Sequence, residues 1–221
     1  DYPFGIVADG NENSYVAGGT DGTLPSQVNS GGFDAFVRKY DSTGNEVWTR
    51  QFGTSGVDNA FDIGVDANEN SYVAGRTNGV LPGQTSSGDM DAFVRRYDTA
   101  GNVVWTRQFG TSAGDSADGI DVDATGRSYI VGSTGGVFPG FEYGAVYPFI
   151  REYDPMGNPG VTVQLEGAGV EVANGIAVDA AGNYYVSGHI GGAWPDSSSS
   201  GGRDAYVRKY SAGTNSTCAG W

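Results

Sequence analysis

The chain contains very little cysteine, histidine or lysine. Among its 221 residues there is one cysteine, Cys218, and one histidine, His189. A single cysteine excludes an internal disulfide framework and a cysteine-based zinc site. A single histidine excludes a multi-histidine metal centre and argues against a Ser-His-Asp triad. Only two lysines stand beside ten arginines, which, together with abundant glycine, serine and threonine, is typical of a secreted surface.

Positive charge and long apolar runs are also scarce. Acidic residues outnumber basic residues 26 to 12, which gives a formal net charge of −14. We expect no nucleic-acid partner, because phosphate binding needs a basic surface. No run of 18 apolar residues occurs, so no segment is predicted to span a membrane. No basic segment followed by an apolar stretch opens the chain, so we expect any signal peptide to have been removed.

The motifs of common enzyme classes are absent. The chain has no G-x-S-x-G, no H-E-x-x-H and no phosphate-binding P-loop. Acid pairs such as Asp89 and Asp91 lie in a glycine-rich loop. We therefore expect a protein without enzymatic activity.

What the chain does contain is internal repetition. A string of eight residues starts at Asp34 and returns, with substitutions, at Asp91, Tyr147 and Asp204, at steps of 57, 56 and 57 residues. Two further strings, S-Y-V-A-G and V-W-T-R-Q-F-G, keep the same step. Such a period is the signature of a repeat architecture. The predicted units cover residues 1–57, 58–114, 115–170 and 171–221.

Each unit is predicted to form four short β-strands. In the second unit we expect them at residues 62–65, 71–74, 92–97 and 103–109. These runs are rich in β-branched and aromatic residues and are bounded by glycine, asparagine and aspartate, whereas no segment has a sustained helical period. Four strands per unit, repeated four times, predict an all-β protein with one domain over residues 1–221, a four-bladed β-propeller. A solenoid is disfavoured, because its coils rarely need four strands and an extended loop.

The repeat resembles a known family. Residues 176–188 read I-A-V-D-A-A-G-N-Y-Y-V-S-G, each unit continues with an apolar residue before a proline, and residues 32–41 read G-F-D-A-F-V-R-K-Y-D. This pattern resembles the SBBP (seven-bladed β-propeller) repeat family of bacterial and archaeal proteins. The resemblance implies a propeller fold and a surface or secreted location, and it implies no reaction. The chain departs from the family name in having four units.

One acidic residue stands near the start of every unit. The four are Asp1, Asp58, Asp115 and Glu171. The first strand of a propeller blade lines the central channel, so four closed blades would place these carboxylates around one channel mouth. The four carboxylates of such a ring repel one another unless a cation or arginines neutralise their charge. Ca²⁺ is the metal that suits an oxygen-rich site, and pairing with the arginines that recur in the third strands is the favoured alternative.

The end of the fourth unit has diverged. Where the first two units read V-W-T-R-Q-F-G, residues 217–221 read T-C-A-G-W. An unpaired strand edge can accept a strand from another chain, and head-to-tail contacts that do not close form fibres. We therefore predict a structural or adhesive module at the cell surface or outside the cell. We expect it to self-associate into an oligomer or filament, with Cys218 and Trp221 at the contact.

A carbohydrate-binding module is the alternative hypothesis. Its candidate surface is a rim of apolar side chains, one before a proline in each unit: Leu24, Leu81, Phe138 and Trp194. If these four side chains are exposed, we expect the rim to bind glycans or other surface proteins. These loops do not repeat a set of polar residues, which argues against four equivalent sugar sites.

Overall fold

The computed structural model shows an all-β protein. It describes residues 1–221 except 142–145, 166–170, 192–200, 212–216 and 219–221, and of Thr217 and Cys218 it describes the backbone alone. No helix occurs among the described residues, so none there could cross a membrane.

The described strands form four antiparallel sheets, and each sheet takes four strands from one consecutive stretch of the chain. Sheet 1 comprises β1 (Tyr2–Ala8), β2 (Ser14–Thr20), β3 (Asp34–Tyr40) and β4 (Glu46–Phe52). Sheet 2 comprises β5 (Asp58–Val65), β6 (Ser71–Thr77), β7 (Asp91–Tyr97) and β8 (Val103–Phe109). Sheet 3 comprises β9 (Asp115–Val122), β10 (Ser128–Thr134), β11 (Tyr147–Tyr153) and β12 (Pro159–Gln164). Sheet 4 comprises β13 (Glu171–Val178), β14 (Tyr184–Ile190), β15 (Asp204–Tyr210) and β16 (Thr217–Cys218).

An aspartate fixes the turn between neighbouring strands. Asp41, after β3, accepts hydrogen bonds from the backbone N–H groups of Thr43 and Asn45, both at 2.9 Å, and from the side-chain amide of Asn45 at 3.0 Å. The bonds from Asn45 hold the pKa of Asp41 well below its usual value. Gly44 completes the turn with a left-handed φ of 87°, which glycine adopts without steric cost.

A β-bulge interrupts the first strand of every sheet. The register between β1 and β2 passes from Pro3 directly to Gly5, which leaves Phe4 unpaired. The other three first strands show the same shift. Bulges redirect a side chain away from the alternating pattern of the strand. The bulged residues are Phe4, Phe61, Asp118 and Asn174.

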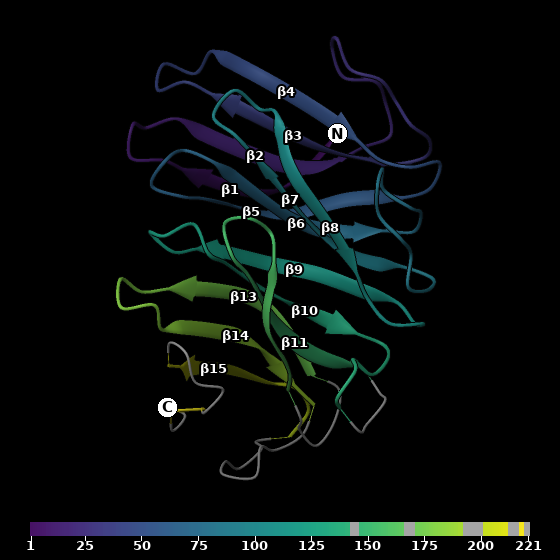
Figure 1. Cartoon of the computed structure of the whole chain (residues 1–221), viewed down its shortest axis with the longest axis vertical. Coiled ribbons are helices and arrows are strands. Elements are labelled where there is room, and N and C mark those ends of the chain that lie inside the picture. Colours follow the sequence, from purple (N-terminus) through teal and green to yellow (C-terminus); the bar gives the residue numbers. More distant parts are fainter. Residues whose placement is uncertain (142–145, 166–170, 192–200, 212–216, 219–221) are drawn as a thin grey trace.

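The sheets stack face to face in chain order, with sheet 1 at the top and sheet 4 at the bottom (Figure 1). The first strands β1, β5, β9 and β13 contact one another in that order. Three hydrophobic clusters form the core, and each lies between two neighbouring sheets. In the first cluster the Trp48 ring lies 6.2 Å from the Tyr15 ring and 6.0 Å from the Tyr97 ring of sheet 2. Tyrosine and tryptophan rings thus pack between neighbouring sheets.

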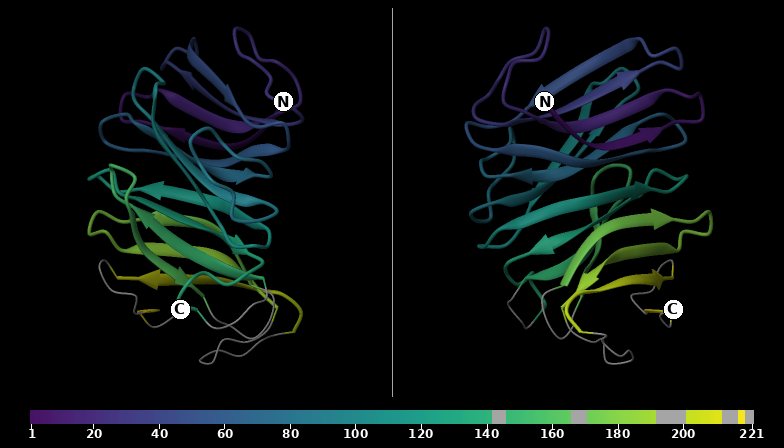
Figure 2. Two further views of the ribbon diagram at one scale, coloured as in Figure 1. Left: turned by 45° about the vertical axis from the view of Figure 1, so that its right-hand side comes forward. Right: turned by 180° about the vertical axis from the view of Figure 1, so that it is seen from behind.

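The first and last sheets do not meet. They lie at opposite ends of the stack in both further views (Figure 2), and β1 and β13 make no substantial contact. The closed ring of four blades predicted from the repeats is therefore not formed among the described residues, because sheet 4 does not pack against sheet 1. The molecule is an open stack with two end faces.

Candidate functional site at the ends of the stack

The contacts between sheets 1 and 2 and between sheets 2 and 3 follow one pattern. The fourth strand of one sheet places a phenylalanine against aromatic residues of the next, whereas at the contact between sheets 3 and 4 Leu165 stands in place of the phenylalanine. The Phe52 ring lies 5.5 Å from the Phe93 ring and 6.4 Å from the Tyr97 ring. The same contacts recur between sheets 2 and 3. Aromatic pairs at these separations stabilise a contact beyond the area they bury.

The recurring arginines take part in this contact. The guanidinium of Arg95 lies 3.8 Å from the centre of the Phe52 ring, and its Nε donates a 2.9 Å hydrogen bond to the hydroxyl of Thr106. Arg151 lies over Phe109 in the same way, at 4.5 Å. A cation–π contact thus occurs where the sequence led us to expect ion pairs between blades.

Sheet 1 presents the receiving half of this contact without a sheet to fill it. A cavity of about 220 Å³ opens on its outer face, lined by Asp1, Pro3, Val16, Leu24, Phe36, Arg38 and Tyr40. The same positions in sheet 2, all buried against sheet 1, are Asp58, Ala60, Val73, Leu81, Phe93, Arg95 and Tyr97. We call the cavity and its surroundings the first end face.

Residues at the same position of successive units differ in exposure, because the neighbouring sheet that covers this position in sheets 2 and 3 is not present at the first end face. Ile6 is 72% exposed, whereas Ile63 and Ile120, one and two units later, are 3% and 4% exposed. Arg38 has no aromatic ring from a preceding sheet and instead lies 3.6 Å from Glu46 in its own sheet. The first end face is therefore built like a sheet-to-sheet contact, and no other described sheet of residues 1–221 covers it.

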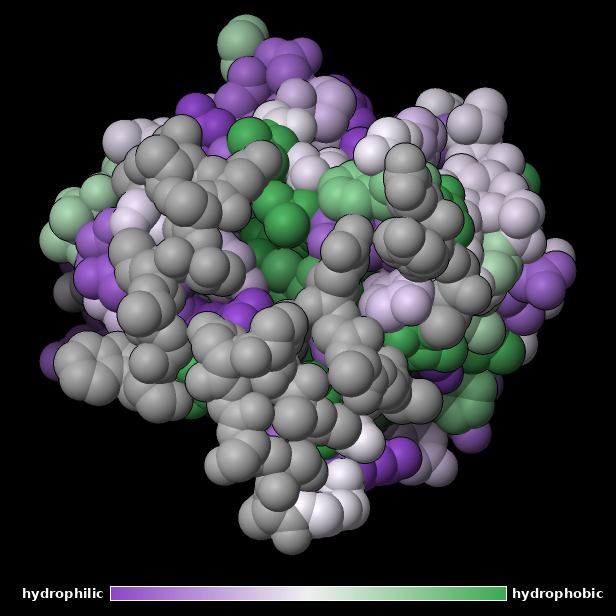
Figure 3. Space-filling model, turned by 90° about the horizontal axis from the view of Figure 1, so that it is seen from below, coloured by the Kyte–Doolittle hydropathy of each residue, from purple (hydrophilic) through white to green (hydrophobic). Residues whose placement is uncertain are grey.

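Sheet 4 presents the complementary half at the opposite end. Val207 is 52% exposed, whereas Val37 and Val94 at the same position in sheets 1 and 2 are fully buried. Seen from below, this end has apolar residues at the centre of its surface (Figure 3). In the register of β15 and β16, Cys218 pairs with Lys209. We call this the last end face.

The four acids predicted to form a ring do not come together. Each of the first three is bonded near its own strand: Asp58 accepts a 2.6 Å bond from the N–H of Thr54, and Asp115 accepts one of the same length from Thr111. No group of three or more potential metal ligands exists within the described residues. The ring predicted around a channel mouth does not form, because the sheets do not close.

Glu171 differs from the other three acids. In sheet 1 the hydroxyl of Thr20 donates a 2.6 Å bond to Asp1. Ile190 occupies that position in sheet 4, and neither carboxylate oxygen of Glu171 accepts a hydrogen bond from a described residue. Burial raises the pKa of Glu171 to about 7, although the charge of Arg208 acts in the opposite direction. Glu171 is thus a poorly compensated acid, since neither hydrogen bonds nor the charge of Arg208 offset the effect of its burial.

Three of the four predicted rim residues are buried. Leu24, Leu81 and Phe138 are 6%, 0% and 3% exposed. Leu81 and Phe138 belong to the hydrophobic clusters between sheets, and Leu24 lines the cavity of the first end face. Trp194 and Trp221 lie outside the described residues, and the side chain of Cys218 is not described. The loops therefore do not present these three side chains as a binding platform.

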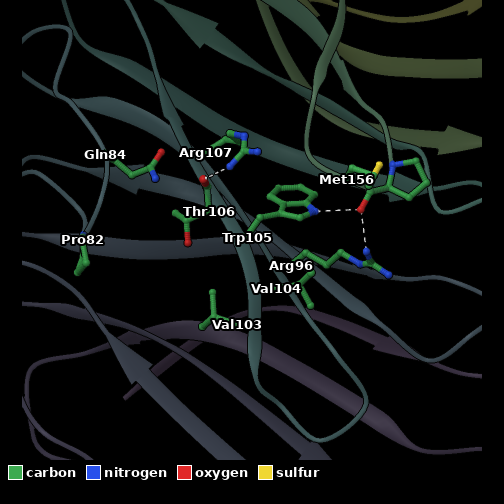
Figure 4. Close-up of a pocket in the computed structure, with 10 residues that line it drawn as sticks. Pro82, Gln84, Arg96, Val103, Val104, Trp105, Thr106, Arg107 and Met156 are labelled. Atoms are coloured by element: carbon green, nitrogen blue, oxygen red, sulfur yellow. Dashed lines mark hydrogen bonds between the residues drawn. The ribbon is translucent and has the colours of Figure 1, made fainter.

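Sequence analysis missed a groove of about 610 Å³ on the outer edge of sheet 2 (Figure 4). The indole N–H of Trp105 and the guanidinium of Arg96 both donate to the carbonyl oxygen of Pro155, at 3.1 and 2.7 Å. Val103 and Val104 are about half exposed beside them. The groove is lined by both polar and apolar groups, and the donors of Trp105 and Arg96 are already paired within the chain.

Comparison with protein families agrees with the fold. The model of the SBBP family, described as a β-propeller repeat, matches residues 47–82 and 104–139. The chain therefore contains SBBP β-propeller repeats. Each match begins in the fourth strand of one sheet and ends after the second strand of the next. The SBBP repeat thus spans the junction between sheets, which is the contact that the end faces leave unfilled.

Two individual proteins are similar to parts or all of the chain. Over 72 residues it is 38% identical to the regulatory protein FlaEY of Caulobacter vibrioides, which covers 31% of this chain and 8% of that protein. A point mutant of Synechocystis apocarotenoid oxygenase superposes with a TM-score of 0.51 at 10% identity, over 98% of this chain and 48% of that one. The chain spans less than half the length of either protein. The structural likeness shows the fold alone.

Proposed function

We propose that the chain is a non-enzymatic structural module, located at the cell surface or outside the cell, that assembles by packing its end faces head to tail. The proposal rests on one observation. The seven positions that line the cavity of the first end face are, one unit later in sheet 2, all buried, and five of these residues belong to the hydrophobic cluster shared with sheet 1.

The chemistry of the faces supports a second copy as the occupant. In a head-to-tail pair, sheet 4 of one copy packs on sheet 1 of the next, as sheet 1 packs on sheet 2 within the chain. Sheet 4 offers Tyr185, Ala205 and Val207. Sheet 1 uses Tyr15, Ala35 and Val37 at those positions. Fully burying one side chain such as Ile6 contributes roughly 1.5–3 kcal/mol, so association has an apolar driving force.

Assembly of this kind has two geometric outcomes. Contacts between two different faces of one molecule give a ring if the rotation closes and a filament if it does not. Both satisfy the proposal, since both fill the first end face with a last end face.

Single substitutions on the two faces test the proposal. We expect Ile6→Glu and Val207→Glu to fold normally, because both side chains are exposed in one copy, and to remain monomeric, because each buries a charge at the contact. Val104→Glu, on the outer edge of sheet 2 and 48% exposed, is the matched control and should associate like the wild type. Light scattering gives the mass, and negative-stain imaging shows rings or filaments. A wild-type chain that stays monomeric at every concentration would contradict self-association.

The carbohydrate-binding alternative at the rim loops has less support. Its platform required exposed apolar side chains, and Leu24, Leu81 and Phe138 are buried. Weak binding of glycans that is unchanged by polar substitution of Val80 and Val137, which are exposed in the same loops, would argue against this site.

A further inference from the structure

The inner edge of the stack carries side chains that do not recur. The recurring residues build the sheets and the contacts between them, but the four bulged residues of the first strands are phenylalanine twice, then aspartate and asparagine. The next-to-last residues of the second strands are equally diverse: Gly19, Arg76, Ser133 and His189. Because the fold accepts a different residue in each unit, packing does not dictate the side chains at these positions.

Two of the bulged residues form an aromatic surface that crosses from sheet 1 to sheet 2. The Phe4 and Phe61 rings lie 5.5 Å apart in an edge-to-face arrangement. The guanidinium of Arg76 lies 5.2 Å from the centre of the Phe61 ring. Phe4 is 52% exposed, so one aromatic side chain of this surface remains open to a ligand.

A donor and an acceptor lie beside this aromatic surface. Asp118, the bulged residue of sheet 3, is half-buried and accepts a 2.5 Å bond from the hydroxyl of Ser116. Burial raises the pKa of Asp118, and the nearby positive charge of Arg76 lowers it. Arg76 is partly exposed, whereas its Nε is buried and has no acceptor among the described residues, so a ligand would meet the terminal nitrogens of the guanidinium. The surface thus combines an exposed ring, a guanidinium and a carboxylate within one short stretch of the inner edge.

This combination matches the chemistry of a sugar ring. A pyranose has an apolar C–H face that packs on an aromatic ring, and its neighbouring hydroxyls each donate and accept hydrogen bonds. An anionic ligand is disfavoured by the net charge of −14 and by Asp62 and Asp121 on the same inner strands. A cationic ligand is disfavoured by Arg76. We propose that the surface formed by Phe4, Phe61, Arg76 and Asp118 binds neutral carbohydrate.

Binding to a panel of immobilised neutral mono- and oligosaccharides, followed by titration calorimetry of the sugars that bind, tests this proposal. We expect Phe4→Ala, Arg76→Ala and Asp118→Asn each to weaken binding about tenfold or more, because each removes an aromatic contact or a hydrogen bond to a charged group. Ile6→Ser is the matched control, since it changes an exposed residue of the same strand β1 on the end face. It should bind as the wild type does.

Three results would overturn the proposal: no binding to any neutral sugar, affinities of Phe4→Ala and Asp118→Asn equal to that of the wild type, or preferential binding of acidic sugars. Failure here is separable from failure of the proposed assembly. Ile6→Glu is expected to be monomeric and should retain sugar binding, because its side chain is not part of this surface.

Discussion

At the scale of single residues, the repeat places the same side chain in different surroundings. Isoleucine is buried at positions 63 and 120 and exposed at position 6, in the same place of the same strand. Inside the stack, Ile63 and Ile120 belong to the hydrophobic clusters between sheets. The sequence alone did not reveal that position 6 has nothing to pack against, because exposure at the end of a stack depends on which sheet comes next.

Glu171 gives a pH prediction at this scale. Its pKa in the folded chain, about 7, lies above the ordinary value of 4.5, so the folded state binds the proton more tightly than the unfolded state. The free energy of unfolding should therefore fall as the pH rises from about 4.5 to about 7. We expect Glu171→Gln to remove this fall and to stabilise the protein at neutral pH by roughly 1–2 kcal/mol, since screening by nearby water reduces the full linkage value.

Urea denaturation at a series of pH values measures this effect. Asp154→Asn is the control, because its turn bonds hold the pKa of Asp154 below the usual value and the substitution should not stabilise the protein at neutral pH. Equal pH dependence in the wild type and Glu171→Gln would contradict the account of Glu171 as a poorly compensated acid.

At the scale of strands and turns, most of the fold could be predicted and some of its details could not. The strings of β-branched and aromatic residues predicted the strands, but the first strand of the second unit was expected to start at residue 62, and β5 begins at Asp58. Sequence analysis missed the start of this strand because Asp58 and Asn59 are polar. Both are buried in the structure, which their residue types do not predict. The bulges were also missed, because they break the alternation on which strand prediction depends.

The candidate sugar site was missed for a related reason. Sequence analysis followed residues that recur, and the inner surface of Phe4, Arg76 and Asp118 consists of residues that do not. A comparison of the four units that looked for chemically diverse positions would have found the signal, but only the structure shows that these positions contact one another.

The turn after β3 provides a prediction for this scale. Gly44 has a left-handed φ of 87° and no atom within 4 Å of the position of an added Cβ, so backbone conformation alone decides the effect of a side chain. We expect Gly44→Ala to destabilise the protein by about 1 kcal/mol.

Gly10 supplies the control, because it has equally open space without a left-handed φ. Gly10→Ala should leave the free energy of unfolding, measured by urea denaturation, within about 0.5 kcal/mol of the wild type. Equal effects of the two substitutions would show that the turn does not need the conformation described here.

At the scale of the whole molecule, the number of sheets could be predicted and their closure could not. The four repeats correctly predicted four sheets. Whether the sheets close depends on how side chains pack between neighbouring sheets, and the repeat pattern does not predict that packing. The predicted acid ring depended on closure and failed with it. The prediction of self-association gained a more specific basis, because the open stack leaves two halves of one contact at its ends.

The most direct test of this account is the mass measured after mixing Ile6→Glu with Val207→Glu. Each variant retains one intact end face, so each alone should be monomeric. Their equimolar mixture should form a pair joined by the one remaining functional contact, the last end face of Ile6→Glu on the first end face of Val207→Glu. A mixture that stays monomeric while the wild type associates, or either variant associating alone, would contradict head-to-tail packing of the end faces.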